Sequence, residues 1–123
     1  MHVPVIGFRP PINGVSHEFN TFRLGMKLHK TLLPGSVVFL LDERNKIIVG
    51  RAEVIRTDLG PLKAMCEQHA QFNHSELGND PDTAPDRLLK TIQKFYGPHI
   101  ATDNKKATVV YLRRLPDEPV QAA

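Results

Sequence analysis

Apolar runs in the first half of the chain predict a series of short β-strands. Residues 3–8 (VPVIGF) are mostly apolar, and the two prolines that follow Arg9 exclude a helix or a central strand at that point. Residues 18–24 (EFNTFRL) alternate in part and contain Phe and Thr, so they predict a second strand. Residues 36–42 (SVVFLLD) form a continuous apolar run with β-branched residues, which predicts a third strand buried on both faces.

Turn-forming residues separate these runs. Pro34 and Gly35 occupy the two central positions that a type II turn prefers, immediately before the third predicted strand. Residues 43–46 (ERNK) predict a hairpin loop that leads into a long strand over residues 47–56. Gly50 lies in the middle of that strand and predicts a bulge or bend, because it has no side chain to resist one.

The spacing of apolar residues changes in the second half and predicts two helices. Residues 61–72 repeat apolar side chains at helical spacing, with Pro61 at the first helical position. The second helix has Thr83 as its N-cap and Asp86 three residues later, and it ends at Gly97. Its apolar stripe predicts core packing and consists of Leu88, Leu89, Ile92, Phe95 and Tyr96.

The last apolar stretch, residues 106–115, returns to a strand pattern before a polar tail. The predicted order is therefore four strands, two helices and a final strand. Many short strands around one core predict an α+β fold, namely a small, partly closed β-barrel flanked by two helices. We assign residues 1–115 to this domain and expect residues 116–123 to form a disordered tail.

The composition narrows the class of protein. The chain has 123 residues, of which 41% are hydrophobic and 24% charged, as in a single folded domain. Cys66 is the only cysteine, so an internal disulfide is impossible and a reducing compartment is expected. The sequence contains no apolar run of the roughly 20 residues that a membrane helix needs, and it does not begin like a secretory signal. We therefore expect a cytoplasmic protein without a membrane partner.

Positive charge is concentrated near the start of the chain. The net charge is +3, and the first 60 residues hold eight Lys or Arg against five Asp or Glu. The stretch that follows Asn20 contains Arg23, Lys27, His29 and Lys30 with no acidic residue up to Ser36. Such a stretch favours an anionic partner such as nucleic acid, and its alternative interpretation is a solvated rim.

The potential metal ligands of the sequence lack the spacing of a metal site. His69 and His74 are five residues apart, so they do not share a helix face, and no second cysteine accompanies Cys66. Cys66 lies on the apolar stripe of the first predicted helix and is interpreted as an inert core thiol. We expect neither a metal nor a cofactor.

The elements quoted above together resemble the ASCH domain, a family of the PUA-like superfamily. The resemblance spans about residues 3–115 and rests on Thr21 and Arg23 at the end of a strand, on the Pro-Gly-Ser turn before an apolar strand, and on the order of elements. It implies that the barrel is PUA-like and has a cleft, and it implies a lineage associated with RNA binding and nucleoside chemistry.

The small bacterial N4-acetylcytidine amidohydrolases of this fold are similar to the chain only in part. Their pocket uses a Lys, a Thr and a Glu, and Thr21 matches the threonine. Glu18 stands at the lysine position, and Asn73 aligns best with the glutamate, although Glu67 and Glu76 are near enough to replace it. Amide hydrolysis needs a group whose pKa the pocket can tune, and an asparagine takes up no proton. We therefore do not expect this reaction.

Two functions remain from different classes. The first is a non-catalytic domain that binds RNA, such as tRNA or single-stranded RNA, or a nucleotide-like ligand in a basic cleft. Asn73 would line the pocket, and the contacts to the nucleic acid would come from Arg23, Arg9, Lys27, His29 and Lys30.

The alternative is a hydrolase that acts on modified nucleosides or RNA, with Glu18 and Thr21 as catalytic residues beside Arg23. Each of these residues also has a purely structural interpretation. Arg23 suits an ion pair with Glu18 or Glu53, and Thr21 suits a strand residue with a satisfied hydroxyl. A protein-interaction module built on the polar loop 73–84 is a third class, for which the sequence has no positive sign.

Overall fold

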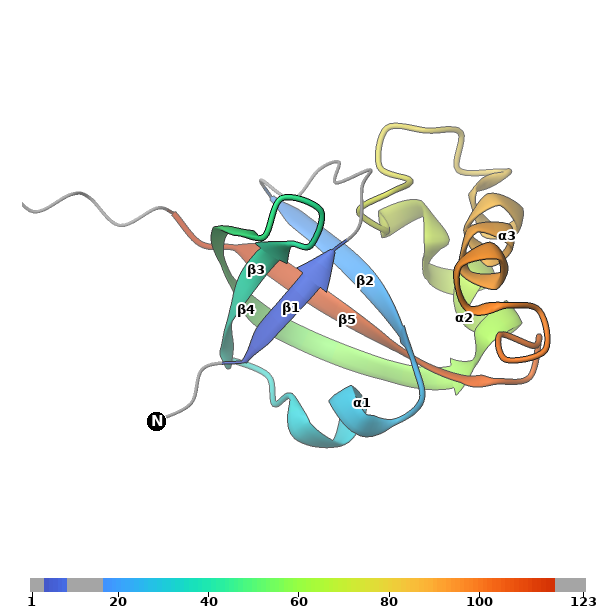
Figure 1. Cartoon of the computed structure of the whole chain (residues 1–123), viewed down its shortest axis with the longest axis horizontal. Helices are drawn as coiled ribbons and strands as arrows, with labels where there is room; N and C mark the ends of the chain where they lie inside the picture. The colour runs from blue at the N-terminus through green and yellow to red at the C-terminus, as the bar shows by residue number, and fades with distance from the viewer. Residues whose placement is uncertain (1–3, 9–16, 117–123) are drawn as a thin grey trace, which may run out of the picture.

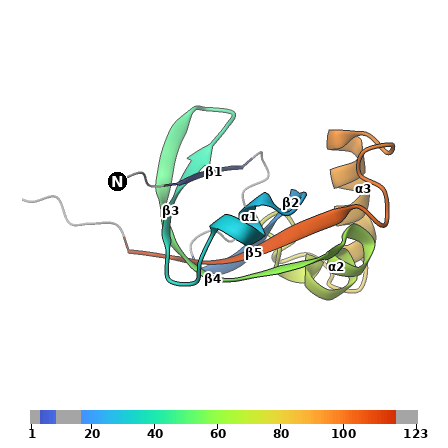
Figure 2. The same ribbon diagram turned by 90° about the horizontal axis from the view of Figure 1, so that it is seen from below.

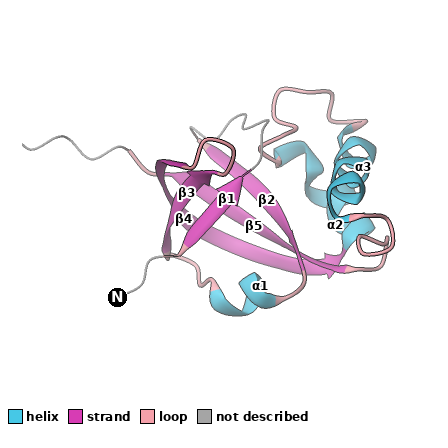
Figure 3. Ribbon diagram, viewed as in Figure 1, coloured by secondary structure: helices cyan, strands magenta, loops and turns pink. Residues whose placement is uncertain are grey.

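Five strands form a single mixed sheet in a computed structural model that describes residues 4–8 and 17–116. The strand order is β1-β3-β4-β5-β2, with β1 parallel to β3 and the other neighbours antiparallel (Figure 3). The elements in chain order are β1 (Val5–Phe8), β2 (Glu18–Leu24), α1 (Lys27–Thr31), β3 (Val37–Asp42), β4 (Ile47–Pro61), α2 (Leu62–His69), the 3-10 helix η1 (Ala70–Phe72), α3 (Ala84–Tyr96) and β5 (Lys106–Arg114).

The sheet curls into a half-barrel, which confirms the predicted α+β fold with a partly closed barrel (Figure 1). The strands β1 and β2 are the two edges of the sheet, and no ladder joins them. Instead, the guanidinium of Arg23 on β2 donates a hydrogen bond to the carbonyl of Gly7 on β1. We call this gap, which side chains bridge, the seam.

The segment after η1 lies along the free edge of β2 at the seam. Asn20 and Asn73 form an isolated parallel bridge, and the backbone N–H of His74 donates to the carbonyl of Asn20 at 3.1 Å. The ring of His74 packs edge-on against Phe8 of β1, with 4.9 Å between ring centroids. Residues far apart in the sequence therefore meet at the seam.

The two faces of the sheet carry separate hydrophobic cores, because successive strand residues point to opposite sides. On β5, Val110 and Leu112 point into the barrel interior. Ala107 and Val109 of the same strand pack against α2 and α3 on the outer face. Figure 2 shows these two helices together at one end of the curled sheet.

The long strand β4 is irregular where the sequence predicts it. Leu40 pairs with Gly50 and Leu41 pairs with Ile48, which leaves Val49 as the extra residue of a bulge. The guanidinium of Arg114 occupies the space that a Cβ at position 50 would take, so a side chain there would displace it. The predicted bulge at Gly50 is therefore confirmed and has a packing reason.

The predicted boundaries of turns and helices also agree with the structure. The N–H of Ser36 donates to the carbonyl of Leu33 at 3.0 Å, and Gly35 has a φ of +89°, as the third residue of a type II turn requires. Helix α3 ends at Gly97, which has a φ of +92°. Thr83 stands at the N-cap position but makes no capping hydrogen bond, and its hydroxyl accepts one from the side chain of Arg87.

Three expectations about the elements are wrong, and one element is missing from them. Strand β3 is not buried on both faces, since Val37 is 38% exposed. Phe95 and Tyr96 belong to the predicted core stripe but are 46% and 37% exposed. Strand β4 continues beyond residue 56 to Pro61, and the short helix α1 is not predicted at all.

Within the described ranges, the protein has no helix of the length and hydropathy that crossing a membrane requires. Most of the predicted tail, residues 117–123, lies outside the described residues.

Candidate ligand-binding site

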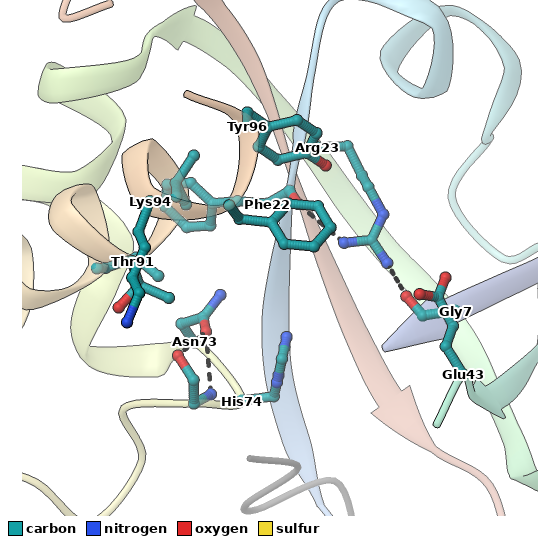
Figure 4. A pocket seen from close by; sticks show the side chains of 13 residues that line it. Gly7, Phe22, Arg23, Glu43, Asn73, His74, Thr91, Lys94 and Tyr96 are labelled. Carbon is teal, nitrogen blue, oxygen red and sulfur yellow. Dashed lines mark hydrogen bonds between the residues drawn. The ribbon is translucent and has the colours of Figure 1, made fainter. Parts of the chain in front are cut away.

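A cavity of about 640 Å³ lies between the seam of the barrel and α3. Sites for small molecules and cofactors in proteins have volumes in this range. Figure 4 shows Phe22 near its centre, with Arg23 on one side and Thr91 and Lys94 on the other. The lining therefore comes from four places: the edge strands β1 and β2, the turn after β3, the segment after η1, and α3 from Leu88 to its end.

Arg23 is held at the barrel edge by three hydrogen bonds. Its Nη1 atom donates to the hydroxyl of Thr21 and to the carbonyl of Phe22, both at 2.9 Å, and its Nη2 atom donates to the carbonyl of Gly7. The guanidinium also lies 5.6 Å from the ring centroid of Phe8. Burial lowers the pKa of Arg23, whereas the nearby Tyr96 and Glu43 raise it, and the side chain stays charged at neutral pH.

Glu43 brings a carboxylate to the same end of the cavity. It is the first residue of the turn between β3 and β4, and its side chain occupies the space where a Cβ at Gly7 would lie. Because Gly7 has no side chain, the backbone of β1 can lie close to the carboxylate of Glu43. Since Lys94 lines the opposite wall, the described lining carries two cations and one carboxylate rather than a uniformly positive surface.

Asn73 presents an amide to the cavity and is only 2% exposed. Its Oδ1 atom accepts hydrogen bonds from the backbone N–H of Ser75 at 2.9 Å and from the Ser75 hydroxyl at 2.7 Å. Its Nδ2 atom donates to Oδ1 of Asn20 at 3.4 Å. Both acceptor positions of the amide oxygen are therefore occupied, and the nitrogen is the group that a ligand can meet.

Aromatic rings form the apolar part of the lining. Phe22 is 7% exposed and lies at the base of the cavity, where α3 packs on the sheet. Phe95 and Tyr96 at the end of α3 are exposed and meet edge-to-face, with 4.7 Å between centroids. They sit on the same helical stripe as the core residue Ile92, so the stripe extends beyond the core and over the cavity.

The two candidate catalytic residues do not come together in the structure. Thr21 is fully buried and accepts a hydrogen bond from Arg23, whereas Glu18 is exposed at the start of β2, opposite Arg113. Three positions separate them on one strand, so their side chains point to opposite faces of the sheet. Neither belongs to the described lining of the cavity.

The ion pairs expected for Arg23 are likewise formed elsewhere. Glu53 pairs with Arg113, with 2.5 Å between the nitrogen and the oxygen. Glu18 lies near the same arginine and contributes to raising its pKa, after the larger effects of Glu53. Glu43, not Glu18 or Glu53, is the acidic residue beside Arg23.

The basic residues after Arg23 are apart from the cavity. Lys27, His29 and Lys30 lie on α1, are exposed, and do not belong to the described lining. His29 instead contacts the hydroxyl of Thr57 on β4, with 2.8 Å from Nδ1 to Oγ1. Arg9 lies outside the described residues.

The site residues predicted from the sequence include Arg23 and Asn73 but not the other charged residues that line the cavity, Glu43 and Lys94. The sequence places Glu43 in a hairpin loop. For Phe95 and Tyr96 it favours core packing over base stacking, because both follow the helical period. A signal was present only for Lys94, the basic residue in the last turn of a helix whose stripe ends in two adjacent aromatic residues.

The cysteine and the acidic and imidazole side chains make no metal site in the described part of the chain. No group of three or more His, Cys, Asp or Glu is arranged there to hold a metal ion. Cys66 is buried, and burial, with a smaller effect of Glu67, raises the pKa of its thiol to about 12. The sulfur is therefore protonated at neutral pH, which agrees with an inert core thiol.

The same architecture occurs in a solved structure. The chain is similar to the crystal structure of protein EF3133 from Enterococcus faecalis V583, described under the family model DUF984, with a TM-score of 0.56 and 12% sequence identity. The match covers 85% of this chain but only 64% of that one, so the chain spans less than two thirds of the length of the protein it matches. At this identity the likeness extends to the fold alone. No protein-family model matches the sequence, and no curated protein matches it either.

Proposed function

We propose that this chain is a non-catalytic binding domain whose cavity holds one nucleotide, either free or as a unit of an RNA. The observation that carries the proposal is the combination of aromatic, cationic and amide groups around one cavity of about 640 Å³. A nucleotide has a matching set of groups: a planar base, an anionic phosphate and base edges that form hydrogen bonds. The resemblance of the sequence to the ASCH domain is consistent with this ligand class.

The cationic groups suit the phosphate. The three hydrogen bonds of Arg23 to the protein use three of the five N–H donors of a guanidinium, so two remain for a ligand. Because the side chain is already fixed, little conformational entropy is lost when it binds an anion. Lys94 adds a second cation from α3.

The aromatic and amide groups suit the base. Phe95 and Tyr96 are exposed rings at the cavity, and an aromatic face can stack a base in a largely sequence-independent way. Asn73 offers its amide nitrogen as a donor, which suits a carbonyl group of the base.

The hydrolase alternative has less support from the geometry. It needs Glu18 and Thr21 at one reaction centre, and their side chains point to opposite faces of β2. An acyl or phosphoryl transfer needs the acid-base group within hydrogen-bond reach of the reacting atoms. Glu43 would have to replace Glu18 in that role, and its carboxylate already lies beside the positive charge of Arg23.

Binding assays test the proposal directly. We expect calorimetry to detect CMP, UMP, AMP or GMP, and fluorescence anisotropy to detect a short single-stranded RNA. The logarithm of the binding constant should fall linearly with the logarithm of the salt concentration. The slope should be shallow compared with that of proteins that track a nucleic-acid backbone, because Arg23 and Lys94 neutralise only one or two phosphates. Lys94→Ala and Tyr96→Ala should each weaken binding about tenfold, as expected for a lost phosphate contact or a lost stacking contact.

A matched control lies on the same helix. Lys90 is exposed on α3 and is not part of the described lining, so Lys90→Ala should bind like the wild type. Absence of binding to every nucleotide and RNA would refute the proposal, as would equal effects of Lys90→Ala and Lys94→Ala. Turnover of acetylated cytidine or of RNA that is lost in Thr21→Ala and Glu18→Gln would favour the hydrolase instead.

A further inference from the structure

Exposed basic side chains gather at one end of the sheet, where β2 and β4 end and β5 begins. We call this surface the basic edge. It takes its residues from α1, from the start of α2, from the connection after α3 and from the first position of β5. Figure 1 shows α1 and the start of β5 along the same lower edge of the molecule. The exposed basic residues of this edge are Lys27, His29, Lys30, Lys63, Lys105 and Lys106.

Backbone pairing brings these segments together. The carbonyl of Lys106 accepts a hydrogen bond at 2.7 Å from the N–H of Gly25, two residues before α1. Pro61, the last residue of β4, pairs with Lys106 from the other side. The N–H of Leu62 then donates to the carbonyl of Lys105 at 2.8 Å. Since paired backbones lie about 5 Å apart, the ends of three segments meet within roughly 10 Å.

Little negative charge offsets these lysines. The acidic residues of the same segments are Asp103 and Glu67. None of the five lysines forms an ion pair with a carboxylate of the described residues. The chain holds 16 Lys or Arg and 13 Asp or Glu, so 11 of each kind remain outside this group of five lysines and two acids. The net charge of +3 therefore belongs to the basic edge, and an extended anion is the partner that complements it.

The basic edge adjoins the cavity on β5. Arg23 of the cavity pairs with Thr108, and Lys106 lies two positions before Thr108 on the same strand. Opposed residues and residues two positions apart share a face of the sheet, so Arg23 and Lys106 are diagonal neighbours about 7–8 Å apart. On the opposite wall, the connection that carries Lys105 begins directly after Tyr96, which lines the cavity. A chain of phosphates that leaves the cavity at Arg23 therefore meets Lys106 next.

We propose that the ligand of the cavity is one unit of a single-stranded RNA, and that the phosphates of the neighbouring units lie on the basic edge. This inference rests on the proposed nucleotide site and decides between a free nucleotide and a unit of an RNA. Lysines suit the task, because an ammonium group binds a phosphate as a point charge and reads no base. A single strand suits the cavity, because its unstacked bases can be splayed out and stacked on aromatic side chains.

Fluorescence anisotropy with RNAs of increasing length tests the inference. We expect labelled oligomers of U, C or A to bind more tightly as their length rises from two to six and twelve nucleotides. The slope of the logarithm of the binding constant against the logarithm of the salt concentration should steepen by about 0.7 for each further phosphate contact. A dinucleotide, which stays in the cavity, should keep the shallow slope. Equal affinities and slopes for the dinucleotide and the twelve-nucleotide RNA would overturn the inference.

Paired substitutions separate the basic edge from the cavity. Lys105→Ala/Lys106→Ala should weaken binding of the twelve-nucleotide RNA about tenfold and reduce its salt slope by about 1.4, the effect of two lost phosphate contacts. The same variant should bind UMP, CMP and AMP like the wild type. Arg44→Ala/Lys90→Ala removes two exposed cations elsewhere and provides the matched control, which should leave RNA binding unchanged. Equal effects of the two double variants would contradict a role for the basic edge.

A second pair of substitutions keeps the test decisive should the first variant not fold. Lys27→Ala/Lys30→Ala on α1 should weaken binding of the twelve-nucleotide RNA in the same way. The competing partner is an anionic membrane, because Met26 and Leu33 are exposed on either side of α1. Vesicles of phosphatidylglycerol and phosphatidylcholine are therefore included. Sedimentation with the anionic vesicles that depends on these lysines, in place of RNA binding, would overturn the inference in favour of a lipid surface.

The cavity variants distinguish failure of this inference from failure of the proposed function. If the basic edge and the cavity hold one strand, Lys94→Ala and Tyr96→Ala should weaken binding of both the mononucleotides and the twelve-nucleotide RNA. RNA binding that depends on the basic edge but not on Lys94 or Tyr96 would overturn the nucleotide site and leave the edge as an RNA-binding surface. Binding of mononucleotides without any gain for longer RNA would keep the nucleotide site and overturn the path along the edge.

Discussion

Arg23 serves both the fold and the candidate site. Its hydrogen bond to Gly7 joins the two edge strands of an open sheet, its hydrogen bond to Thr21 fixes it on β2, and its side chain lines the cavity. The Thr-x-Arg pattern drew attention to this residue from the sequence alone. Its neighbour Glu43 could not be found in the same way, because only the curl of the sheet brings a hairpin turn 20 residues away next to β2.

Replacement of Arg23 by alanine should destabilise the protein. The hydrogen bonds that a charged guanidinium makes are each worth roughly 1.5–3 kcal/mol, and part of that is recovered by water at a half-exposed edge. We expect the free energy of unfolding to fall by about 2 kcal/mol, measured by urea denaturation. Arg44→Ala, which removes an exposed arginine from the turn after β3, should change it by less than about 0.5 kcal/mol. Equal effects of the two substitutions would contradict a bridging role for Arg23.

At the scale of elements, α3 combines a core helix with one wall of the cavity. Its buried residues Ala84, Leu88 and Ile92 repeat every four positions and pack on the sheet. Phe95 and Tyr96 continue the same stripe past the edge of the core, which is why helical periodicity alone places them inside. Periodicity identifies the face of a helix, whereas the length of the neighbouring core decides how much of that face is covered.

Leu88→Ala should loosen α3 and with it the cavity. Leu88 is 3% exposed, and substitutions of this kind in a core cost roughly 2–5 kcal/mol. We expect a loss of about 3 kcal/mol in the free energy of unfolding, measured by urea denaturation. Lys90→Ala, two residues further on and exposed, should stay within about 0.5 kcal/mol of the wild type. A cost below that limit for Leu88→Ala would show that α3 is not anchored through this residue.

Strand boundaries show a second limit of sequence reasoning at this scale. Apolar runs locate all five strands, but β4 continues through Thr57 and Asp58, which have no strand pattern of their own. These residues are extended because they pair with Val110 and Val109 of β5. Pairing with a distant strand thus overrides local preference. Helix α1 has no buried residue, so no periodic signal could reveal it.

For the whole molecule, one sheet with a hydrophobic core on each face explains why the fold class is readable from the sequence. The alternation of β5 and the stripes of α2 and α3 are both local patterns. The closure of the barrel is different, because it depends on Arg23, His74 and a carbonyl of β1 that meet from separate parts of the chain. The candidate site lies at this closure, so most of its residues could not be placed together from the sequence.

The stability of the whole molecule should depend on His69 in mildly acidic solution. Burial holds the pKa of His69 below its ordinary value of 6.5, so the unfolded chain binds a proton at this residue more readily than the folded chain does. The free energy of unfolding should therefore fall as the pH drops below 6.5 and level off once the folded protein is also protonated. Urea denaturation between pH 7.5 and 5.0 measures this, and His69→Gln should flatten the curve relative to His99→Gln. A curve for His69→Gln as steep as that of the wild type would assign the effect to other groups.

The ladder between β4 and β5 ends where Pro61 pairs with Lys106. Residues 62–105, which hold both large helices, therefore leave the sheet and return to it at directly opposed positions. The segment behaves as an insertion into a five-stranded barrel: its ends are fixed a strand spacing apart, whatever lies between them. One wall of the cavity belongs to this insertion and the other to the barrel. Exchange of the insertion for another helical segment with a matching apolar face would thus alter ligand preference without disturbing the strand pairing that supports Arg23.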